Sequence, residues 1–191
     1  MLNISRVSAC LVSREPIPAC VLESLTGFGE IIVGDGTHGV IARYEAVRMA
    51  KFDVVYSQDD DCLVNLDRLI SGWDGRFVSY FNTAQNRRYP RGPEYLGYGS
   101  FFKKSLVRTL DLYTTKWGVD DLLRRECDRV FTRMNRVKSV GFSFKKKDSP
   151  CVVNLPTATD ASRLHMQPEH FERAKQINKR IDLLLQVSHD R

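Results

Sequence analysis

The chain has 191 residues, of which 42% are hydrophobic, and this is long enough to bury a sizeable core in a single domain. The net charge is +6 and the sequence pI is about 9.1, a balance that favours anionic partners. Phosphate-bearing small molecules, nucleic acid and an acidic membrane surface all meet that condition, so charge alone does not choose among them.

The cysteines and the N-terminus narrow the class of protein further. The five cysteines, at positions 10, 20, 62, 127 and 151, are odd in number and never spaced as C-x-x-C, which argues against a disulfide framework or a zinc knuckle. Arg6 and Arg14 flank only a few hydrophobic residues, and no apolar run approaches the length of a membrane span. We therefore expect a soluble, reduced, cytoplasmic protein without membrane insertion.

The first third of the chain alternates between strand and helix patterns. Strands are expected at 7–12, 30–33 and 52–56. A helix opened by Pro16 and Pro18 lies between the first two, and an amphipathic helix from Val40 to Arg48 lies between the last two. This series predicts a parallel α/β sheet with right-handed crossovers, in which the loops after Val12, Val33 and Gln58 share one edge.

The acidic triplet, Asp59, Asp60 and Asp61, ends the third of these strands. Residues i and i+2 of an extended segment point to the same side, so Asp59 and Asp61 can converge while Asp60 faces away. Two carboxylates on one side suit Mg²⁺ or Mn²⁺, and ligands of open α/β sheets bind beyond the carboxyl ends of the strands. The alternative is a solvated acidic turn. An EF-hand calcium loop is disfavoured, because Leu63 stands at position five and no glycine follows it.

The remainder of the chain continues the α/β pattern. The sequence predicts helices at 63–70, 101–110, from Val119 onward and from about Pro168 onward, and strands at 77–81 and 137–144. Residues 82–93 read as a basic loop, 95–100 as an aromatic run with two glycines, and 145–147 as a solvated charge run. The last helix is expected to face inward with Phe171, Ala174, Ile177, Ile181 and Leu184. We expect one domain over 1–191, with a nucleotide-binding half at 1–62 and an acceptor-side half with the C-terminal helix at 63–191.

Taken in order, these motifs resemble a small glycosyltransferase of the GT-A fold, closest in pattern to the family 2 type. The family has a first strand that ends near a nucleotide-base contact, then E-I-I-V-V-D-D-G-S, a helix with Arg and Ala, and a strand that closes on D-x-D. Here the corresponding residues are Ser13-Arg14, Glu30 to Gly36, Ala42-Arg43 and the acidic triplet. The resemblance covers the first two-thirds of the chain. It implies a single-domain, Rossmann-like α/β fold with a mixed, mainly parallel sheet flanked by helices.

The resemblance also implies the roles of individual residues toward a nucleotide-sugar donor. Asp35 would contact the uracil or other base, Asp59 and Asp60 would lie at the ribose and phosphates, and Asp61 would bind the metal directly. Ser13, Arg14 and Arg43 belong to the same donor-binding set. The paired acid and the Ser-Thr-Asp of the family are shortened here to Asp35-Gly36-Thr37-His38, which leaves the identity of the nucleotide open, a UDP-sugar being the expected donor.

The family has an acidic pair after its glycine-rich acceptor segment, and this pair supplies the catalytic base of inverting members. Asp120-Asp121 matches it in order, and Asp121 is our candidate for the group that takes the proton of the attacking hydroxyl. Asp128 is the second candidate. The alternative for the pair is a helix start whose negative charge complements the helix dipole.

A C-terminal histidine often completes the metal site of GT-A enzymes, and either His165 or His170 could serve here. A histidine ligand would move the preference from Mg²⁺ toward Mn²⁺. Arg163 could stabilise the leaving diphosphate. The alternative is that these are ordinary surface side chains beside a helix start.

The expected activity is thus a metal-dependent transfer of a sugar from a nucleotide-diphosphate donor to a hydroxyl acceptor. The basic and aromatic acceptor side favours an anionic acceptor, and a modified base in DNA is one candidate. A nucleotidyltransferase is the alternative enzyme, although the loop after the first strand, Ser13 to Pro16, lacks the usual glycine. A nucleic-acid-binding module is the non-enzymatic alternative. The sequence leaves the sugar, the acceptor, the stereochemical outcome and the oligomeric state open.

Overall fold

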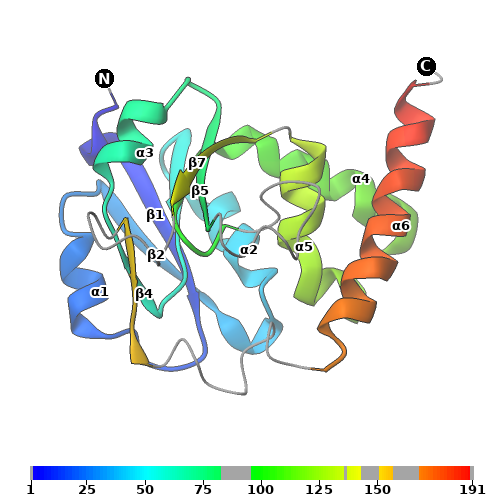
Figure 1. Ribbon diagram of the computed structural model, residues 1–191, viewed down its shortest axis with the longest axis horizontal. Helices are drawn as coiled ribbons and strands as arrows, with labels where there is room; N and C mark the ends of the chain where they lie inside the picture. Colours follow the sequence, from blue (N-terminus) through cyan, green and yellow to red (C-terminus); the bar gives the residue numbers. More distant parts are fainter. Residues whose placement is uncertain (1, 83–95, 136, 143–150, 157–167, 190–191) are drawn as a thin grey trace.

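A computed structural model describes residues 2–82, 96–135, 137–142, 151–156 and 168–189 (Figure 1). The strands are β1 (Val7–Ser13), β2 (Glu30–Asp35), β3 (Val54–Ser57), β4 (Cys62–Val64), β5 (Phe77–Asn82), β6 (Ser100–Lys103), β7 (Lys138–Phe142) and β8 (Val152–Asn154). The helices are α1 (Ala19–Ser24), α2 (Ala42–Met49), α3 (Asp67–Gly72), α4 (Arg108–Trp117), α5 (Asp121–Met134) and α6 (His170–His189). Short 3₁₀ turns lie at Ile4–Arg6, Gly36–His38 and Lys104–Val107.

The main sheet has six strands in the order β2-β1-β3-β6-β5-β7. The pairs β1–β2, β1–β3 and β5–β7 are parallel, and β6 runs antiparallel to both of its neighbours. The expected α/β fold, with a mixed, mainly parallel sheet flanked by helices, is therefore confirmed. A separate two-stranded sheet pairs β4 with β8.

The order of the first three strands creates a topological switch point. From β1 the chain crosses to β2 on one side, and from β2 it crosses back to β3 on the other side of β1. The carboxyl ends of β1, β2 and β3 consequently lie at one edge, and ligands of open α/β sheets bind in the crevice at such a point.

Side-chain alternation along the strands divides the core into two clusters, one on each face of the sheet. Val7, Ala9 and Leu11 of β1 pack with α1 and α3 on one face, whereas Cys10 faces the other cluster, built with α2, α4, α5 and α6. In Figure 1, α4, α5 and α6 lie on the right of the view, and α1 and α3 lie on the left. Strands with both faces covered read as continuous hydrophobic runs, which is why these segments were readable from sequence.

Two expected helices begin differently in the structure. The segment expected to be helical from 101 is strand β6, because Phe101 and Phe102 are both fully buried and point to opposite core clusters, as neighbours in a central strand must. The helix there, α4, starts only at Arg108. The segment 63–70 likewise opens as strand β4, which pairs with β8, before α3 begins at Asp67.

Fewer of the apolar side chains of the last helix, α6, are buried in the core than expected. Ile177 and Ile181 are fully buried, but Phe171 is 62% exposed. Polar contacts also join α6 to α5: Arg133 of α5 donates to Asn178 Oδ1 at 2.9 Å and to Asp182 Oδ1 at 2.8 Å. Within the described residues, no helix has the length and apolar character needed to cross a membrane.

Candidate functional site

The loops that follow β1, β2 and β3 meet at the switch-point edge. Ser13 ends β1, Asp35 ends β2, and the acidic triplet follows β3. Ser13 Oγ hydrogen-bonds to Asp60 Oδ2, so the loops after β1 and β3 are joined by their side chains. Arg14 Nε donates to the carbonyl of Gly36 at 3.1 Å, which joins the loops after β1 and β2. The structure thus brings together the donor-site residues predicted in these three loops.

Gly36 allows the first two of these loops to approach so closely. A Cβ atom at Gly36 would lie 2.7 Å from the carbonyl carbon of Ser13 and 2.8 Å from the amide nitrogen of Arg14. Real Cβ atoms do not approach backbone atoms at such distances, so only glycine fits here.

Asp35 is exposed and caps the 3₁₀ turn that follows it. Its Oδ1 accepts from the backbone N–H of Thr37 at 2.9 Å and from Thr37 Oγ1 at 2.6 Å. These hydrogen bonds stabilise the charged form and lower the pKa of Asp35 below its ordinary value. The carboxylate is therefore ionised at neutral pH, and its second oxygen lies on an exposed side chain where a ligand can reach it.

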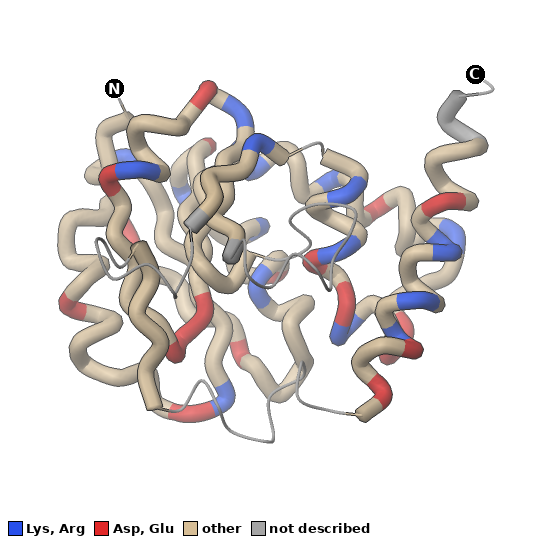
Figure 2. The backbone as a smooth tube through the Cα atoms, in the orientation of Figure 1, with Lys and Arg blue, Asp and Glu red and all other residues tan. Residues whose placement is uncertain are grey.

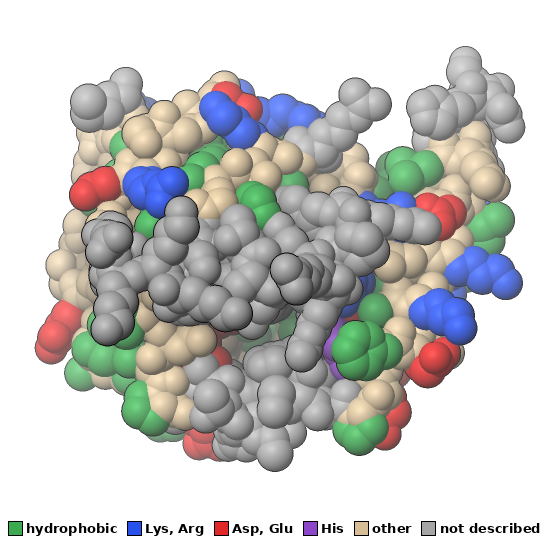
Figure 3. Space-filling view, in the orientation of Figure 1, with side chains coloured by type: hydrophobic (Ala, Val, Ile, Leu, Met, Phe, Trp, Pro, Cys, Tyr) green, Lys and Arg blue, Asp and Glu red, His purple; other side chains and the backbone are tan. Residues whose placement is uncertain are grey.

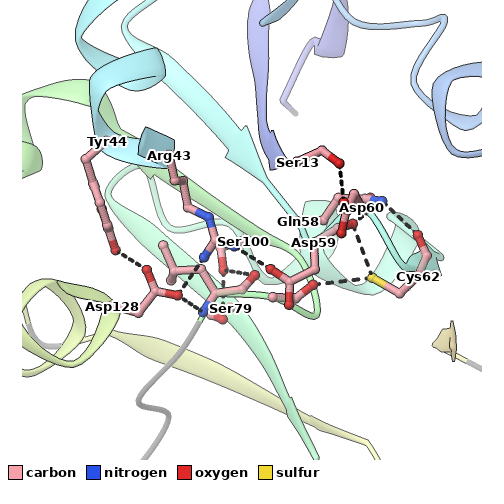
Figure 4. Close-up of polar contacts among 12 residues, drawn as sticks. Ser13, Arg43, Tyr44, Gln58, Asp59, Asp60, Cys62, Ser79, Ser100 and Asp128 are labelled. Carbon is pink, nitrogen blue, oxygen red and sulfur yellow. Dashed lines mark hydrogen bonds and ion pairs between the residues drawn. The ribbon is translucent and has the colours of Figure 1, made fainter. Parts of the chain in front are cut away.

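Arg43 of α2 lies behind the acidic triplet and is 1% exposed. Its Nη2 contacts Asp59 Oδ1, and its Nη1 donates to Asp128 Oδ2 of α5 at 2.6 Å (Figure 4). Tyr44 donates its hydroxyl to the other oxygen of Asp128 at 2.7 Å. Arg43 and Asp59 are both predicted donor-binding residues, but no sequence pattern indicates the pairing of Arg43 with Asp128, which lies 85 positions further along the chain.

The turn that carries the triplet is held by buried groups that sequence reasoning missed. Gln58, 1% exposed, donates to the carbonyl of Cys62 at 2.9 Å and accepts from the hydroxyl of Tyr56 at 2.7 Å. The amide of Asp59 donates to the carbonyl of Gly97 at 2.9 Å, and the amide of Leu155 donates to the carbonyl of Asp61 at 2.7 Å. The triplet is therefore tied to β4, to the residues before β6 and to β8.

The metal expectation for Asp59 and Asp61 stays a prediction. The carboxylates of Asp59 and Asp60 contact different partners, Arg43 and Ser13, and Asp61 is 8% exposed. Across the ranges that the structure describes, no group of three or more His, Cys, Asp or Glu residues is arranged to hold a metal ion. Mg²⁺ does not require such a group, because it is usually held by one or two carboxylates together with substrate phosphates and water.

The two candidates for the catalytic base occupy different environments. The Asp121 side chain is 74% exposed at the start of α5, where it pairs with Arg125 at 2.9 Å. Its neighbour Asp120 is the N-cap of the helix, accepting from the amide of Leu123 at 2.9 Å and contacting Arg180. Asp128 is 9% exposed, and both of its oxygens accept hydrogen bonds. Asp121 therefore stays the candidate that a substrate hydroxyl can reach.

Of the two histidines considered as metal ligands, His170 opens α6 and packs against α5. Its Nε2 lies 3.4 Å from Arg129 Nη2, and its Nδ1 lies 3.4 Å from Glu126 Oε1. Glu126 interrupts the helical backbone of α5, with φ −117° and ψ 17°. His165 and Arg163 lie outside the described residues, so their predicted roles stay predictions.

Charges on the described acceptor side are mixed. Figure 2 shows both basic and acidic residues on α5 and α6. Ion pairs there join Arg125 to Asp121, Arg129 and Arg173 to Glu126, Arg133 to Asp182 and Arg180 to Asp120. On the face shown in Figure 3, the described hydrophobic side chains are scattered among polar and charged ones. The basic loop at 82–93 and the charge run at 145–147, which carried much of the expectation of an anionic acceptor, lie almost wholly outside the described residues.

A hollow of about 480 Å³ lies at the opposite, amino-terminal end of β1 and β3. Its lining includes Arg6, Phe52, Asp53 and Trp73, and none of the predicted site residues.

Comparison with known proteins adds fold-level likeness. No family model matches the chain, and no curated protein does. Among solved structures, the catalytic domain of Drosophila beta1,4-galactosyltransferase 7, in complex with xylobiose, is 12% identical with a TM-score of 0.46, covering 74% of this chain and 66% of its own. Glucosyl-3-phosphoglycerate synthase from Mycobacterium tuberculosis, in complex with Mn²⁺, UDP-glucose and phosphoglyceric acid, is 14% identical with a TM-score of 0.39, covering 59% and 66%. A cytidylyltransferase from Leptospira borgpetersenii is 16% identical with a TM-score of 0.41, covering 92% and 77%.

This chain thus matches about two-thirds of the length of each of the two glycosyltransferase chains. At these identities the likeness concerns the fold alone.

Proposed function

We propose that the protein is a glycosyltransferase that binds a nucleotide-diphosphate-sugar donor at the carboxyl edge of β1, β2 and β3. The observation that carries this proposal is the switch-point edge itself. Three neighbouring parallel strands deliver Ser13-Arg14, Asp35 and the acidic triplet to one edge, and side-chain contacts connect their loops. This is the place where open α/β sheets bind nucleotides.

Each part of the edge has a chemical role in donor binding. The ionised, exposed Asp35 can accept a hydrogen bond from an N–H group of the base, and uracil offers such a group, so a UDP-sugar is the expected donor. Ser13 and Arg14 lie beside it at the end of β1. Asp60 is fixed by Ser13 and faces the same edge, in the position proposed for the ribose and phosphates.

The donor set also fits a divalent cation. Asp59 and Asp128 hold the buried guanidinium of Arg43 between them, and Asp60 and Asp61 follow Asp59 directly in the chain. Asp61, with Asp59, would hold Mn²⁺ or Mg²⁺ together with the diphosphate oxygens. Bound there, the cation would neutralise the charge of the leaving diphosphate. A histidine ligand from 165 or 170, and Arg163 on the diphosphate, complete the proposed set.

For the transfer itself, we assign the proton of the acceptor hydroxyl to Asp121, as in an inverting reaction. Two observations support this choice. The carboxylate is exposed, and the first turn of α5 lies against the loop that follows β2, because the amide of Ile41 donates to the carbonyl of Arg124 at 3.2 Å. The net charge of +6 favours an anionic acceptor, and a modified DNA base is one candidate among several.

A thermal-shift screen tests the proposal. A ligand that binds only the folded state raises the unfolding temperature by mass action. UDP-, GDP-, dTDP- and ADP-sugars are compared with and without Mn²⁺, beside nucleoside triphosphates and single-stranded DNA. Stabilisation by a nucleotide sugar is the expected result. Stabilisation only by a triphosphate would indicate a nucleotidyltransferase, and stabilisation only by DNA would indicate a binding module.

A further inference from the structure

Arg43 is buried behind the acidic triplet. The whole residue is 1% exposed, and its guanidinium lies between the carboxylates of Asp59 and Asp128 (Figure 4). Within the described residues its Nε is buried without a hydrogen-bond partner, so the two terminal nitrogens make its polar contacts. Among the described residues of the binding edge, the side chain of Arg43 contacts Asp59.

The charge on Arg43 is held in place by these carboxylates. Burial lowers the pKa of Arg43, but Asp128 and Asp59 outweigh this effect and raise it above its ordinary value. The guanidinium is therefore charged at every pH at which the protein folds. Its planar fork can contact two carboxylates at once, and the single ammonium of a lysine does not reproduce that geometry.

Asp128, the other carboxylate that contacts Arg43, is held in place by several hydrogen bonds. It is 9% exposed, its Oδ1 accepts from the Tyr44 hydroxyl at 2.7 Å, and its Oδ2 accepts from Arg43 at 2.6 Å and from the amide of Leu96 at 3.4 Å. Three donors from two other parts of the chain hold the carboxylate, so it is anchored between α2, α5 and the segment before β6.

Asp59 connects Arg43 to the acidic triplet. Its amide donates to the carbonyl of Gly97, and its carboxylate lies against the same residue, because a Cβ atom at Gly97 would lie 2.0 Å from Asp59 Oδ2. The next two residues of the chain are Asp60 and Asp61, whose carboxylates form the proposed donor and cation site. Their backbone therefore starts from a residue that Arg43 and Gly97 hold.

We propose that Arg43 is a positioning residue that ties the acidic triplet to α5 through Asp59 and Asp128, and that it does not contact the donor. The link joins the donor edge to the helix that begins with Asp121. A displacement of α5 would therefore change the position of the acidic triplet through the contacts of Asp128 with Arg43 and of Arg43 with Asp59. The effect on a ligand rests on the proposed function, but the effect on the backbone of the triplet does not.

The test compares Arg43→Lys, Asp128→Asn and Tyr44→Phe by two measurements. The first is amide hydrogen exchange of a peptide spanning 57–64, with a peptide from β1 as the reference. The second is calorimetric affinity for the nucleotide sugar that stabilises the parent protein. Tyr44→Phe is the matched control, because it removes a buried hydrogen bond to Asp128 but leaves the link to Asp59.

We expect Arg43→Lys and Asp128→Asn to accelerate exchange at 57–64 relative to β1, and to weaken donor affinity by roughly 10- to 100-fold, the usual effect of losing a group that orients a ligand-binding carboxylate. Tyr44→Phe should change neither measurement selectively. Asp128→Asn is the second test if Arg43→Lys does not fold, since Asp128 lies on α5 and is joined to Asp59 through Arg43.

Exchange at 57–64 that is no faster in Arg43→Lys or Asp128→Asn than in Tyr44→Phe would overturn the proposal. If exchange changes as expected but the parent protein binds no nucleotide sugar, the positioning role stands and the proposed function fails.

Discussion

Asp35 is the residue whose role toward a ligand can be tested with least disturbance of the fold. It is exposed, and its hydrogen bonds stay within the turn that it caps. Asp35→Ala should weaken donor affinity and lower the stability of the fold only slightly, because the lost hydrogen bonds belong to one exposed turn. Calorimetry and urea unfolding measure the two effects. Normal affinity in the variant would remove Asp35 from the base contact.

Substitutions at Asp121 and Asp128 distinguish a role in catalysis from a role in the fold. Asp121→Asn should bind donor like the parent but lose turnover by roughly 10²-fold or more, the scale of general base catalysis. Single-turnover kinetics with saturating donor measure the loss. Asp128→Asn is the comparison, because its carboxylate is buried and bonded. Equal losses in affinity and rate for Asp121→Asn would instead assign it to the helix start, and normal turnover would exclude it as the base.

Among the structural elements, the segment before β6 packs closely against the acidic triplet. Gly97→Ala would place a methyl group 2.0 Å from Asp59 Oδ2, so it must displace the carboxylate or the segment. We expect a loss of about 1–3 kcal/mol, the usual cost of overpacking, together with weaker donor binding. Urea unfolding with calorimetry measures both.

Gly27→Ala is the matched control for this variant. Its added methyl group would meet only the end of the Ile4 side chain, at 2.8 Å, which can rotate away. Equal and small effects of the two substitutions would show that the close packing of Gly97 on Asp59 is not needed.

Sequence patterns predicted the first three strands and the edge that they share, because buried parallel strands and their turn residues are local signals. They failed at β6, where Phe101 and Phe102 are both buried on opposite faces and mimic the start of a helical stripe. They also failed at β4, whose three residues become a strand only by pairing with β8, which lies about ninety positions further along the chain.

In the candidate site, too, residues that follow a strand could be predicted from the sequence, and contacts between distant segments could not. Ser13, Asp35 and the triplet could be named from the sequence because each follows a readable strand. The Arg43–Asp128 pair and the contact of Gly97 with Asp59 could not, since both depend on how α5 and the segment before β6 pack in three dimensions.

At the scale of the whole molecule, the fold predicts the reactivity of its thiols. Cys10, Cys62, Cys127 and Cys151 are buried, and Cys20 is exposed. Burial raises the pKa of Cys10 to about 12, so almost none of it is thiolate at pH 8. We expect a maleimide to label Cys20 rapidly and the other four only on unfolding, as mass spectrometry can show. Rapid labelling of Cys10 or Cys127 in the native protein would contradict the packing of the core.

If the protein is a metal-dependent glycosyltransferase, its acidic triplet binds a nucleotide sugar together with a divalent cation. The most direct measurement is calorimetric titration of the nucleotide sugar chosen by the thermal screen, with Mn²⁺ or EDTA, into the parent, Asp61→Ala and Asp53→Ala. Asp53 is the control because it is an exposed aspartate just before the amino-terminal end of the same strand, β3. We expect binding by the parent and by Asp53→Ala in Mn²⁺, and none in EDTA or with Asp61→Ala. Donor binding that is unchanged by EDTA or by loss of the Asp61 carboxylate would contradict it.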